Sequence, residues 1–268
     1  MNQTIGFIGG GNMASAIIGG ILASKQATPP QIIVSDKSEL QLAHLQERYG
    51  IQTTTNNFQT TAQADILFLA VKPNIAQIVL TEIGDSLKPE ALLISIVTGL
   101  SISAMERILS RPVKLVRAMP NTPVLVGEGM SALCLNENVQ KAEEILALSL
   151  FACFGKAQLV PESLMPTVTG VSGSSPAYAY LFIEAMADAA VLDGMARNLA
   201  YEFAAQSLLG AAKMVLDTKK HPGELKDMVC SPGGTTIEAV AVLEQEGLRS
   251  AVIKAQRACC RKARELAE

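Results

Sequence analysis

The sequence Thr4-Ile-Gly-Phe-Ile-Gly-Gly-Gly-Asn-Met-Ala14 stands near the start of the chain. Its apolar run from Ile5 to Ile8 is too short for a helix and predicts a buried strand. Gly9-x-Gly11-x-x-Ala14 follows, and then a helix-forming stretch to Ala23. In such a pattern the first glycine permits a tight turn, the second lets the backbone approach a pyrophosphate, and the alanine lets the helix pack on the strand. Strand, glycine turn and helix together predict a nucleotide-phosphate site at the helix start.

Length and composition limit the classes of protein that fit. The chain has 268 residues, enough for one or two domains with a sizeable core. Its formal net charge is −3 and it has no Lys/Arg-rich run, so we expect no nucleic-acid partner. The apolar runs are too short to cross a bilayer, and no charged-then-apolar leader precedes the first strand. We therefore expect neither membrane insertion nor export.

The cysteines and histidines argue against several chemistries. The five cysteines are odd in number and show no Cys-x-x-Cys spacing, which favours reduced thiols in a cytoplasmic protein. With only His44 and His221 in the chain, neither a metal site nor a Ser-His-Asp hydrolase is expected. The chemistry then has to come from a cofactor, hydroxyls, backbone groups and carboxylates.

The first half of the chain alternates short apolar runs with helical patterns. Strands are expected at residues 5–8, 32–35, 51–55, 65–71, 91–97, 113–117 and 130–135. Ser38-x-x-Gln41 and Ser103-x-x-Glu106 have the form of capping boxes that begin two of the helices. The alternation predicts an α/β domain over residues 1–161 with a Rossmann-like, doubly wound parallel sheet.

Composition changes after Pro161. From Leu164 onward no strand is expected, and Tyr180, Ile183 and Ala187 begin a set of apolar residues at helical spacing. Residues 162–268 are therefore predicted to form an all-α domain. Because its apolar surface is too large for a lone lobe, we expect this domain to form a homodimer, which could assemble into a higher oligomer of dimers.

Polar turns follow several of the predicted strands. Ser35-Asp36-Lys37-Ser38 stands where an adenosine ribose would lie. An acid there usually accepts from the ribose 2′-hydroxyl and favours NAD, whereas serines and a lysine favour a 2′-phosphate. An ordinary polar turn with a helix cap is the alternative. Ala70 to Pro73 and Ser95 to Gly99 follow central strands and are expected beside the same crevice.

The helical half contains one stretch that an ordinary helix start does not explain. In Ser231-Pro-Gly-Gly-Thr-Thr236, Thr235-x-x-Glu238 has the form of a capping box and accounts for Thr235 as the helix cap. It leaves the hydroxyl of Thr236 unused. Free amides at a helix start after two glycines are suited to binding a carboxylate. This stretch therefore predicts a second small-molecule site.

Five stretches together resemble the pyrroline-5-carboxylate reductases: residues 6–14, 70–73, 117–123, 172–178 and 221–236. The resemblance implies reduction of the cyclic imine Δ1-pyrroline-5-carboxylate to L-proline by NAD(P)H, in interlocked dimers. It implies substrate contacts at Ser231, Gly234, Thr235 and Thr236, with the Thr236 hydroxyl as the catalytic group at the ring nitrogen. Family cofactor contacts correspond to Ile8, Gly9, Gly10, Gly11, Asn12, Met13, Ser35, Asn56, Ala70, Val71, Lys72, Pro73, Val97 and Thr98, with Glu162 lining the cofactor region.

We expect NADP(H) to be preferred over NAD(H), with modest discrimination, because Asp36 opposes the cofactor-binding Lys37 and its neighbouring serines. Two other functions fit less well. A related cyclic imine or ketimine reductase would share both sites, whereas a non-catalytic dinucleotide-sensing dimer would not need the second one. The stretch from Val171 to Met195 contains no Lys, Arg or His to act as a general base. A protonated imine accepts hydride without such a base, so imine reduction fits this absence.

Overall fold

The structure is a computed structural model that describes residues 2–266. The chain divides into two compact units. Among the described residues, 2–173 and 259–266 form the sheet unit, and Ser174–Ala258 form the helical unit. Residues 162–173 and 259–266 thus belong to the sheet unit. The border after residue 161, which was drawn from composition, stays a prediction.

The sheet unit is built on eight strands in the order β3-β2-β1-β4-β5-β6-β7-β8. β1 to β6 run parallel, whereas β7 is antiparallel to β6 and β8 is parallel to β7. The sheet is therefore Rossmann-like, as predicted, but mixed rather than wholly parallel. The strands are β1 (Ile5–Ile8), β2 (Ile32–Ser35), β3 (Gln52–Thr54), β4 (Ile66–Leu69), β5 (Leu92–Ser95), β6 (Lys114–Met119), β7 (Gly129–Leu135) and β8 (Gly155–Leu159).

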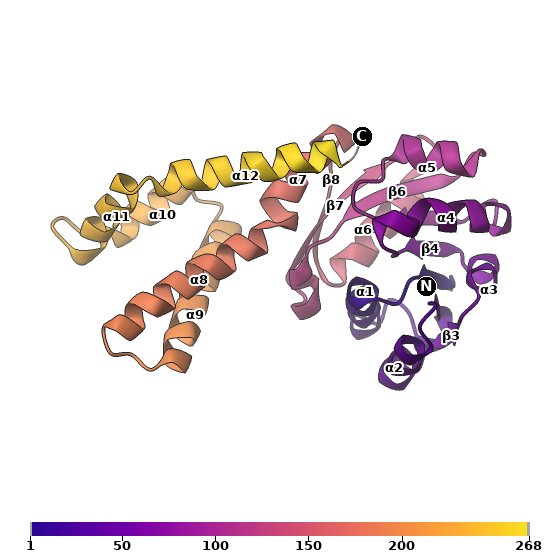
Figure 1. Ribbon diagram of the computed structural model, residues 1–268, viewed down its shortest axis with the longest axis horizontal. Helices are drawn as coiled ribbons and strands as arrows, with labels where there is room; N and C mark the ends of the chain where they lie inside the picture. The colour runs from indigo at the N-terminus through magenta and orange to yellow at the C-terminus, as the bar shows by residue number, and fades with distance from the viewer. Residues whose placement is uncertain (1, 267–268) are drawn as a thin grey trace. The chain divides into compact units, whose positions relative to one another are not determined.

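Helices cover both faces of this sheet (Figure 1). α1, α2 and α6 pack on one face and α4 and α5 on the other. Neighbouring residues of one strand serve opposite faces, since Phe7 belongs to the first core and Ile8 to the second. The helices of this unit are α1 (Asn12–Ala23), α2 (Glu39–Tyr49), α3 (Asn57–Gln63), α4 (Pro73–Ile83), α5 (Ile102–Leu109), α6 (Lys141–Ala152) and α7 (Met165–Val168).

The helix caps correct one of the predicted starts. The Ser38 hydroxyl accepts from the Gln41 amide and caps α2, as expected. The cap of α5 lies two residues earlier than predicted, because the Ser101 hydroxyl accepts from the Ala104 amide. The predicted box at Ser103 and Glu106 is therefore wrong. Ser103 already lies inside the first turn, with its hydroxyl 3.2 Å from that of Ser101.

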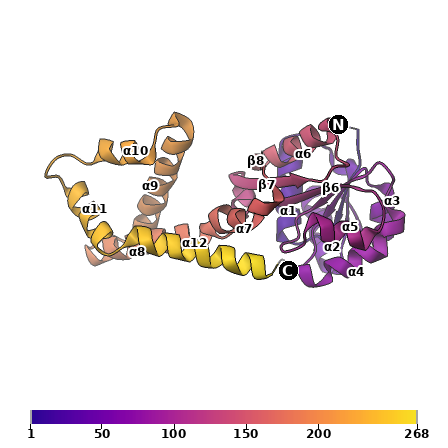
Figure 2. The ribbon, with the colours of Figure 1, turned by 90° about the horizontal axis from the view of Figure 1, so that it is seen from above.

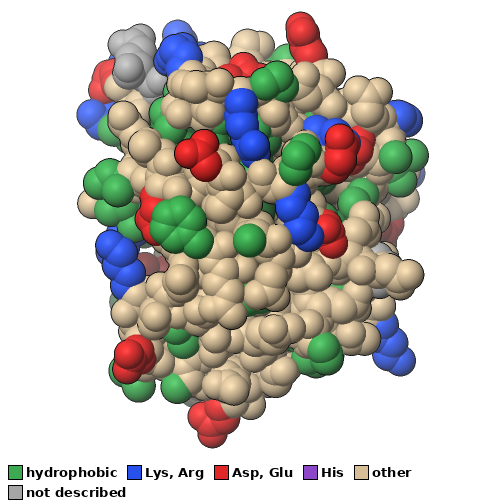
Figure 3. Space-filling view, turned by 90° about the vertical axis from the view of Figure 1, so that its right-hand side faces the viewer, with side chains coloured by type: hydrophobic (Ala, Val, Ile, Leu, Met, Phe, Trp, Pro, Cys, Tyr) green, Lys and Arg blue, Asp and Glu red, His purple; other side chains and the backbone are tan. Residues whose placement is uncertain are grey.

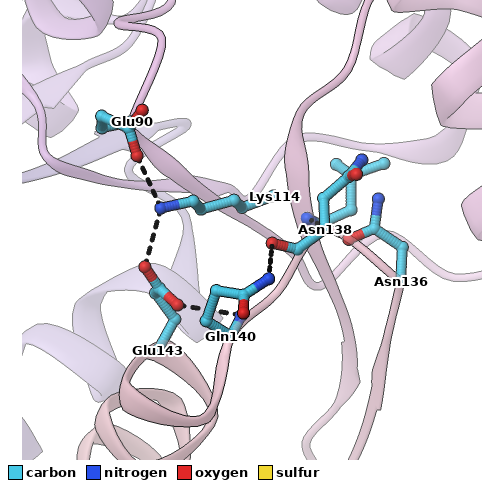
Figure 4. Close-up of polar contacts among 7 residues, drawn as sticks. Glu90, Lys114, Asn136, Asn138, Gln140 and Glu143 are labelled. Atoms are coloured by element: carbon cyan, nitrogen blue, oxygen red, sulfur yellow. Dashed lines mark hydrogen bonds and ion pairs between the residues drawn. The ribbon is translucent and has the colours of Figure 1, made fainter.

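An ion-pair network fastens the amino end of β6 to α6 (Figure 4). The Lys114 ammonium lies 2.7 Å from a carboxylate oxygen of Glu143 and 2.7 Å from one of Glu90. The hydrogen bond to Glu143, and then that to Glu90, raises the pKa of Lys114, and the hydrogen bond from Lys114 lowers the pKa of Glu143. Glu143 also accepts from the Gln140 amide at the start of α6. The network lies at the edge of the sheet opposite the carboxyl ends of the parallel strands.

The outer surface of the sheet unit is mixed in charge. In the view of Figure 3, Lys and Arg side chains lie interspersed with Asp and Glu, and hydrophobic side chains gather only in small separate groups. Within residues 2–266, no helix is long and apolar enough to cross a membrane.

The helical unit contains α8 (Ser175–Leu192), α9 (Arg197–Thr218), α10 (Pro222–Val229), α11 (Thr235–Gln245) and the first part of α12 (Leu248–Glu265). α8 and α9 pack side by side, and Figure 2 shows α10 and α11 as separate helices joined by a loop. Only Ala187, Ala200 and Ala204 are buried within residues 174–258. Ala187 is thus covered within its own chain, whereas Tyr180, on the same predicted stripe, is 61% exposed. The stripe does not form a single buried face.

Candidate active site

The carboxyl ends of the central strands meet at one edge of the sheet. In the strand register Ile8 of β1 is paired with Ser35 of β2 and with Leu69 of β4, which is paired in turn with Ser95 of β5. The sheet order reverses between β1 and β4, which is where open α/β sheets bind their ligands. A cleft of about 290 Å³ lies there, lined by Ile8, Gly9, Gly11, Ser35, Asp36, Lys37, Asn57, Ala70, Val71, Lys72, Ile75 and Val79.

The glycine loop has the shape that a pyrophosphate needs. Gly9 has a φ of +96°, and a Cβ there would lie 2.5 Å from the carbonyl oxygen of Ala70. Gly11 is the N-cap of α1 and has no side-chain cap, and a Cβ built on it meets nothing within 4 Å. The amides of the first turn of α1 are therefore open to an anion at the cleft. This open cradle fits a dinucleotide phosphate.

The polar side chains at the end of β2 and in the turn after it lie partly inside the fold and partly at its surface. The Ser35 side chain is fully buried, and its hydroxyl donates to Asn57 Oδ1 at 2.8 Å. The Asp36 carboxylate accepts from the amides of Gly10 and Ser38. Lys37 is exposed at the mouth of the cleft. Lys37 is therefore the cation of this turn that is open to a 2′-phosphate.

The structure gathers eight of the predicted cofactor residues at the cleft: Ile8, Gly9, Gly11, Ser35, Lys37, Ala70, Val71 and Lys72. The other eight do not line it, and their cofactor roles stay predictions: Gly10, Asn12, Met13, Asn56, Pro73, Val97, Thr98 and Glu162. The Asn56 side chain accepts from the amides of Phe58 and Gln59 and caps α3. The next residue, Asn57, lines the cleft in its place.

Three cleft residues were not predicted: Asn57, Ile75 and Val79. Ile75 and Val79 lie four residues apart on α4, so one face of that helix forms a wall of the cleft. The apolar spacing of α4 could have indicated the wall, although core packing explains the same spacing. Nothing in the sequence separates Asn57 from Asn56.

Glu162 belongs to a separate polar cluster of the sheet unit. Its Oε1 atom accepts from Arg117 Nη1 at 2.7 Å and from the Ile102 amide, the first amide of α5, at 2.8 Å. Burial, with the charge of Glu162 acting in the same direction, raises the pKa of the nearby Cys134 thiol to about 11. A thiol with that pKa is protonated at neutral pH and is no nucleophile.

Asn121, from the stretch 117–123, has a structural role. Its Nδ2 donates to the carbonyl of Ser172, and its Oδ1 accepts from the Met130 amide. It is buried at the start of a short 3-10 helix, Thr122–Val126. The sequence 117–123 thus ties the end of β6 to β7 and to the π-helical turn Thr169–Gly173 that precedes α8.

The loop of the helical unit from Ser231 to Thr236 is open. Gly233 has a φ of +65°, and the Gly234 amide donates to the carbonyl of Ser231 at 3.1 Å. The N-cap of α11 is Gly234, so the prediction that Thr235 caps this helix is wrong. A Cβ on Gly234 would lie 2.4 Å from Ser231 Oγ, so a larger residue there would require the Ser231 side chain to move.

The side chains of this loop are uncommitted. Among the described residues, the hydroxyls of Ser231, Thr235 and Thr236 form no hydrogen bond, and the first amides of α11 have no side-chain cap. Thr235 is exposed and Thr236 is partly buried. The arrangement offers a carboxylate several backbone N–H donors, and it offers a ring nitrogen a nearby hydroxyl. Within residues 2–266, no group of three or more His, Cys, Asp or Glu side chains is placed to hold a metal ion.

A Rossmann-like sheet with an open glycine cradle, joined to a helical unit, defines the class: an NAD(P)H-dependent oxidoreductase. Residues 4–99 match the family profile described as NADP oxidoreductase coenzyme F420-dependent, and residues 162–266 match that described as pyrroline-5-carboxylate reductase dimerisation.

Similarity to individual proteins extends over the full length. The chain is 50% identical to the pyrroline-5-carboxylate reductase of Escherichia coli K12, covering 100% of both chains. The structure of the pyrroline-5-carboxylate reductase of Coxiella burnetii superposes with a TM-score of 0.94 at 38% identity, covering 100% of both chains. That of the Plasmodium falciparum pyrroline carboxylate reductase with NADP bound gives 0.90 at 33% identity, covering 100% of this chain and 99% of that one. The chain belongs to the pyrroline-5-carboxylate reductase family.

Proposed function

We propose that this chain reduces Δ1-pyrroline-5-carboxylate to L-proline, the last step of proline synthesis, with NADPH preferred over NADH. When bound, the dinucleotide supplies the hydride. The observation that carries the choice of substrate is the loop Ser231–Thr236, whose free amides and hydroxyls match a small carboxylate that bears a ring nitrogen. The relatives of known structure and the E. coli enzyme support the same substrate.

The residues of the sheet unit bind and orient the cofactor. Gly9 lets the chain turn tightly enough for the first amides of α1 to face the cleft, where they neutralise pyrophosphate charge. Lys37 at the cleft supplies a positive charge for a 2′-phosphate, which supports the preference for NADPH. The relative solved with NADP bound is consistent with this preference.

The residues of the helical unit bind and polarise the substrate. The first amides of α11, after Gly234, hold the substrate carboxylate. The Thr236 hydroxyl contacts the ring nitrogen and stabilises its protonated form, so that the imine carbon is electrophilic when the hydride arrives. One hydride and one proton convert the imine to the secondary amine. No side-chain base is needed, because no proton is abstracted from carbon or oxygen.

We further propose that the active form is a homodimer in the cytoplasm. The large exposed side chains of α8 and α9, among them Tyr180, Leu181 and Phe203, support an interface between copies of this unit. The match of residues 162–266 to a dimerisation profile supports it as well. None of the five cysteines, all of which lie within the described residues, forms a disulfide bond, which fits a reducing compartment.

An NADPH-consumption assay with a panel of cyclic imines tests the proposal. We expect turnover of pyrroline-5-carboxylate well above that of pyrroline-2-carboxylate and of the six-membered analogues. Equal or faster reduction of a six-membered imine would assign the chain to a related ketimine reductase. Tight NADPH binding with no turnover of any imine would indicate a dinucleotide sensor.

A further inference from the structure

The turn after β2 reaches back to the glycine loop. Asp36 Oδ2 accepts from the Gly10 amide at 2.7 Å, and Asp36 Oδ1 accepts from the Ser38 amide at 2.9 Å. Hydrogen bonds to a carboxylate are about twice as strong as those between neutral groups. Each oxygen of this side chain therefore already holds a backbone N–H.

A second side chain binds the carbonyl group of the same glycine. Gln41 Nε2 donates to the carbonyl oxygen of Gly10 at 2.6 Å. Gln41 is fixed in turn, because its own amide donates to the capping hydroxyl of Ser38. Gly10 is also packed tightly, since a Cβ there would lie 2.7 Å from Leu45 Cδ1. Both polar groups of Gly10 are thus bound, the amide by Asp36 of the turn after β2 and the carbonyl by Gln41 of α2.

This double contact fixes the backbone that presents the phosphate site. Gly10 and Gly11 have no side chains, so their peptide planes are free to rotate unless something external holds them. Gly11 is the N-cap of α1, and its carbonyl accepts the first helical hydrogen bond from the Ser15 amide, so the peptide before it depends on how Gly10 is held. Rotation at Gly10 would turn the first amides of α1 away from the cleft.

We propose that Asp36 is a positioning residue that acts through the Gly10 backbone, with Gln41 as its counterpart, and that it is not the ribose ligand. An acid after the second strand of a Rossmann sheet usually accepts from the ribose 2′-hydroxyl. Here each of its oxygens already accepts one backbone N–H, and these two bonds direct the carboxylate toward the Gly10 backbone and offset its negative charge. This also explains how an acid can stand beside Lys37 in an enzyme that uses NADPH. The inference rests on the proposed cofactor use.

The first arm of the test uses cofactor-free protein and amide hydrogen exchange by NMR. In Asp36→Ala, exchange at the Gly10 amide should become about tenfold faster or more, because its only acceptor is gone. The Gly9 amide donates to the backbone carbonyl of Ser35 and should keep its rate, which makes it an internal control. General destabilisation would accelerate both amides. Unchanged exchange at Gly10 would contradict the claim that Asp36 holds the Gly10 backbone.

The second arm measures the dissociation constants of NADPH and NADH by nicotinamide fluorescence. Asp36→Ala should weaken both by about tenfold, the loss of one charge-assisted bond, with their ratio unchanged within about twofold. Gln41→Ala should weaken the binding of both nucleotides by about threefold. The double variant should weaken it by less than the product of the two separate effects. Glu39→Ala, an exposed neighbour on α2, is the matched control and should change neither constant.

The two arms separate the possible failures. If Asp36→Ala changes the NADPH-to-NADH ratio by more than about fivefold, Asp36 is a ribose ligand and the inference is wrong. If the unaltered protein binds neither nucleotide, the proposed function fails. The hydrogen-exchange experiment then still tests whether Asp36 holds the Gly10 backbone. Asp36→Asn keeps one acceptor oxygen and should lie between wild type and Asp36→Ala in both arms, which serves if the alanine variant does not fold.

Discussion

The two units differ in how much of their own structure they complete. The sheet unit buries two extensive clusters of aliphatic and aromatic side chains, one on each face of the sheet. The helical unit buries only three alanines between residues 174 and 258. A unit that covers so little of its apolar surface gains little hydrophobic stabilisation from its own chain. Its stability has to come largely from association, whereas the sheet unit has a core of its own.

The two sites differ in the same way. At the cofactor cleft the backbone of Gly10 is held on both sides by side chains of the same unit. In the loop Ser231–Thr236 the hydroxyls of Thr235 and Thr236 have no partner among the described residues. The glycine loop is thus preorganised by the fold, whereas the proposed substrate loop leaves its hydroxyls for a ligand.

The strongest test of the preorganised site is Gly9→Val. Both the positive φ and the 2.5 Å approach to the Ala70 carbonyl oppose a side chain. We expect a loss of about 2–5 kcal/mol in the free energy of unfolding, together with lost cofactor binding. Gly11→Ala is the matched variant, because nothing lies near its Cβ. It should lower NADPH affinity at an unchanged melting temperature. Equal melting temperatures for both variants would contradict this account.

Association of the helical unit is tested by Phe203→Asp. Phe203 on α9 is 59% exposed in the single chain, and a charge at a dimer interface there should weaken the dimer by about 2–4 kcal/mol. Light scattering should show monomers, and thermal melts should show a lower melting temperature that no longer depends on protein concentration. Ile78→Asp, on α4 of the sheet unit, alters a side chain that is 67% exposed and should leave the oligomer intact. An active dimer of Phe203→Asp would sink the idea that this face is the interface.

The open loop predicts different results for two adjacent threonines. Thr236→Val keeps the shape and removes a hydroxyl bonded to a developing charge, worth roughly 1.5–3 kcal/mol, so kcat/KM should fall about 10- to 150-fold. The melting temperature should hardly change. Thr235→Ala should also leave the melting temperature nearly unchanged, because Gly234 and not Thr235 is the cap of α11. A Thr236→Val enzyme with wild-type kcat/KM would remove the catalytic role.

The smallest effect is expected at the ion pairs of Lys114. Glu143→Gln should cost about 1 kcal/mol or less at neutral pH. The folded state lowers the pKa of Glu143, so its contribution is complete above the ordinary value of 4.5 and is lost as the pH falls through the lowered pKa. In thermal melts the variant should therefore have a lower melting temperature than wild type at neutral pH, and the two melting temperatures should become equal at acidic pH. Glu90→Gln is the control, since Glu90 is 86% exposed and Glu143 only 21%. An equal effect of both variants would contradict the role of burial.

Much of the fold follows from local patterns in the sequence. The strands β1, β2, β4 and β5 are short runs without charged residues, apolar except for the terminal Ser35 and Ser95, and all of their residues are buried. A strand that is covered on both faces of the sheet needs apolar residues at successive positions, so the parallel core could be predicted. β8 was not predicted because Gly155–Leu159 is an edge strand with polar and exposed residues. The antiparallel direction of β7 could not be predicted, because no sequence pattern indicates it.

The sequence by itself determined the fold class and predicted which stretches carry the chemistry: the glycines before α1, the turn after β2, and the hydroxyls of Ser231, Thr235 and Thr236 at the start of α11. It could not determine where their atoms point. Whether Asp36 faces a ribose or Gly10, whether Asn56 or Asn57 lines the cleft, and whether Thr235 or Gly234 caps α11 were decided by tertiary structure. Each choice lies between alternatives with similar local energies. Contacts from elsewhere in the chain, such as Gly10 for Asp36 and Ser35 for Asn57, decide between them.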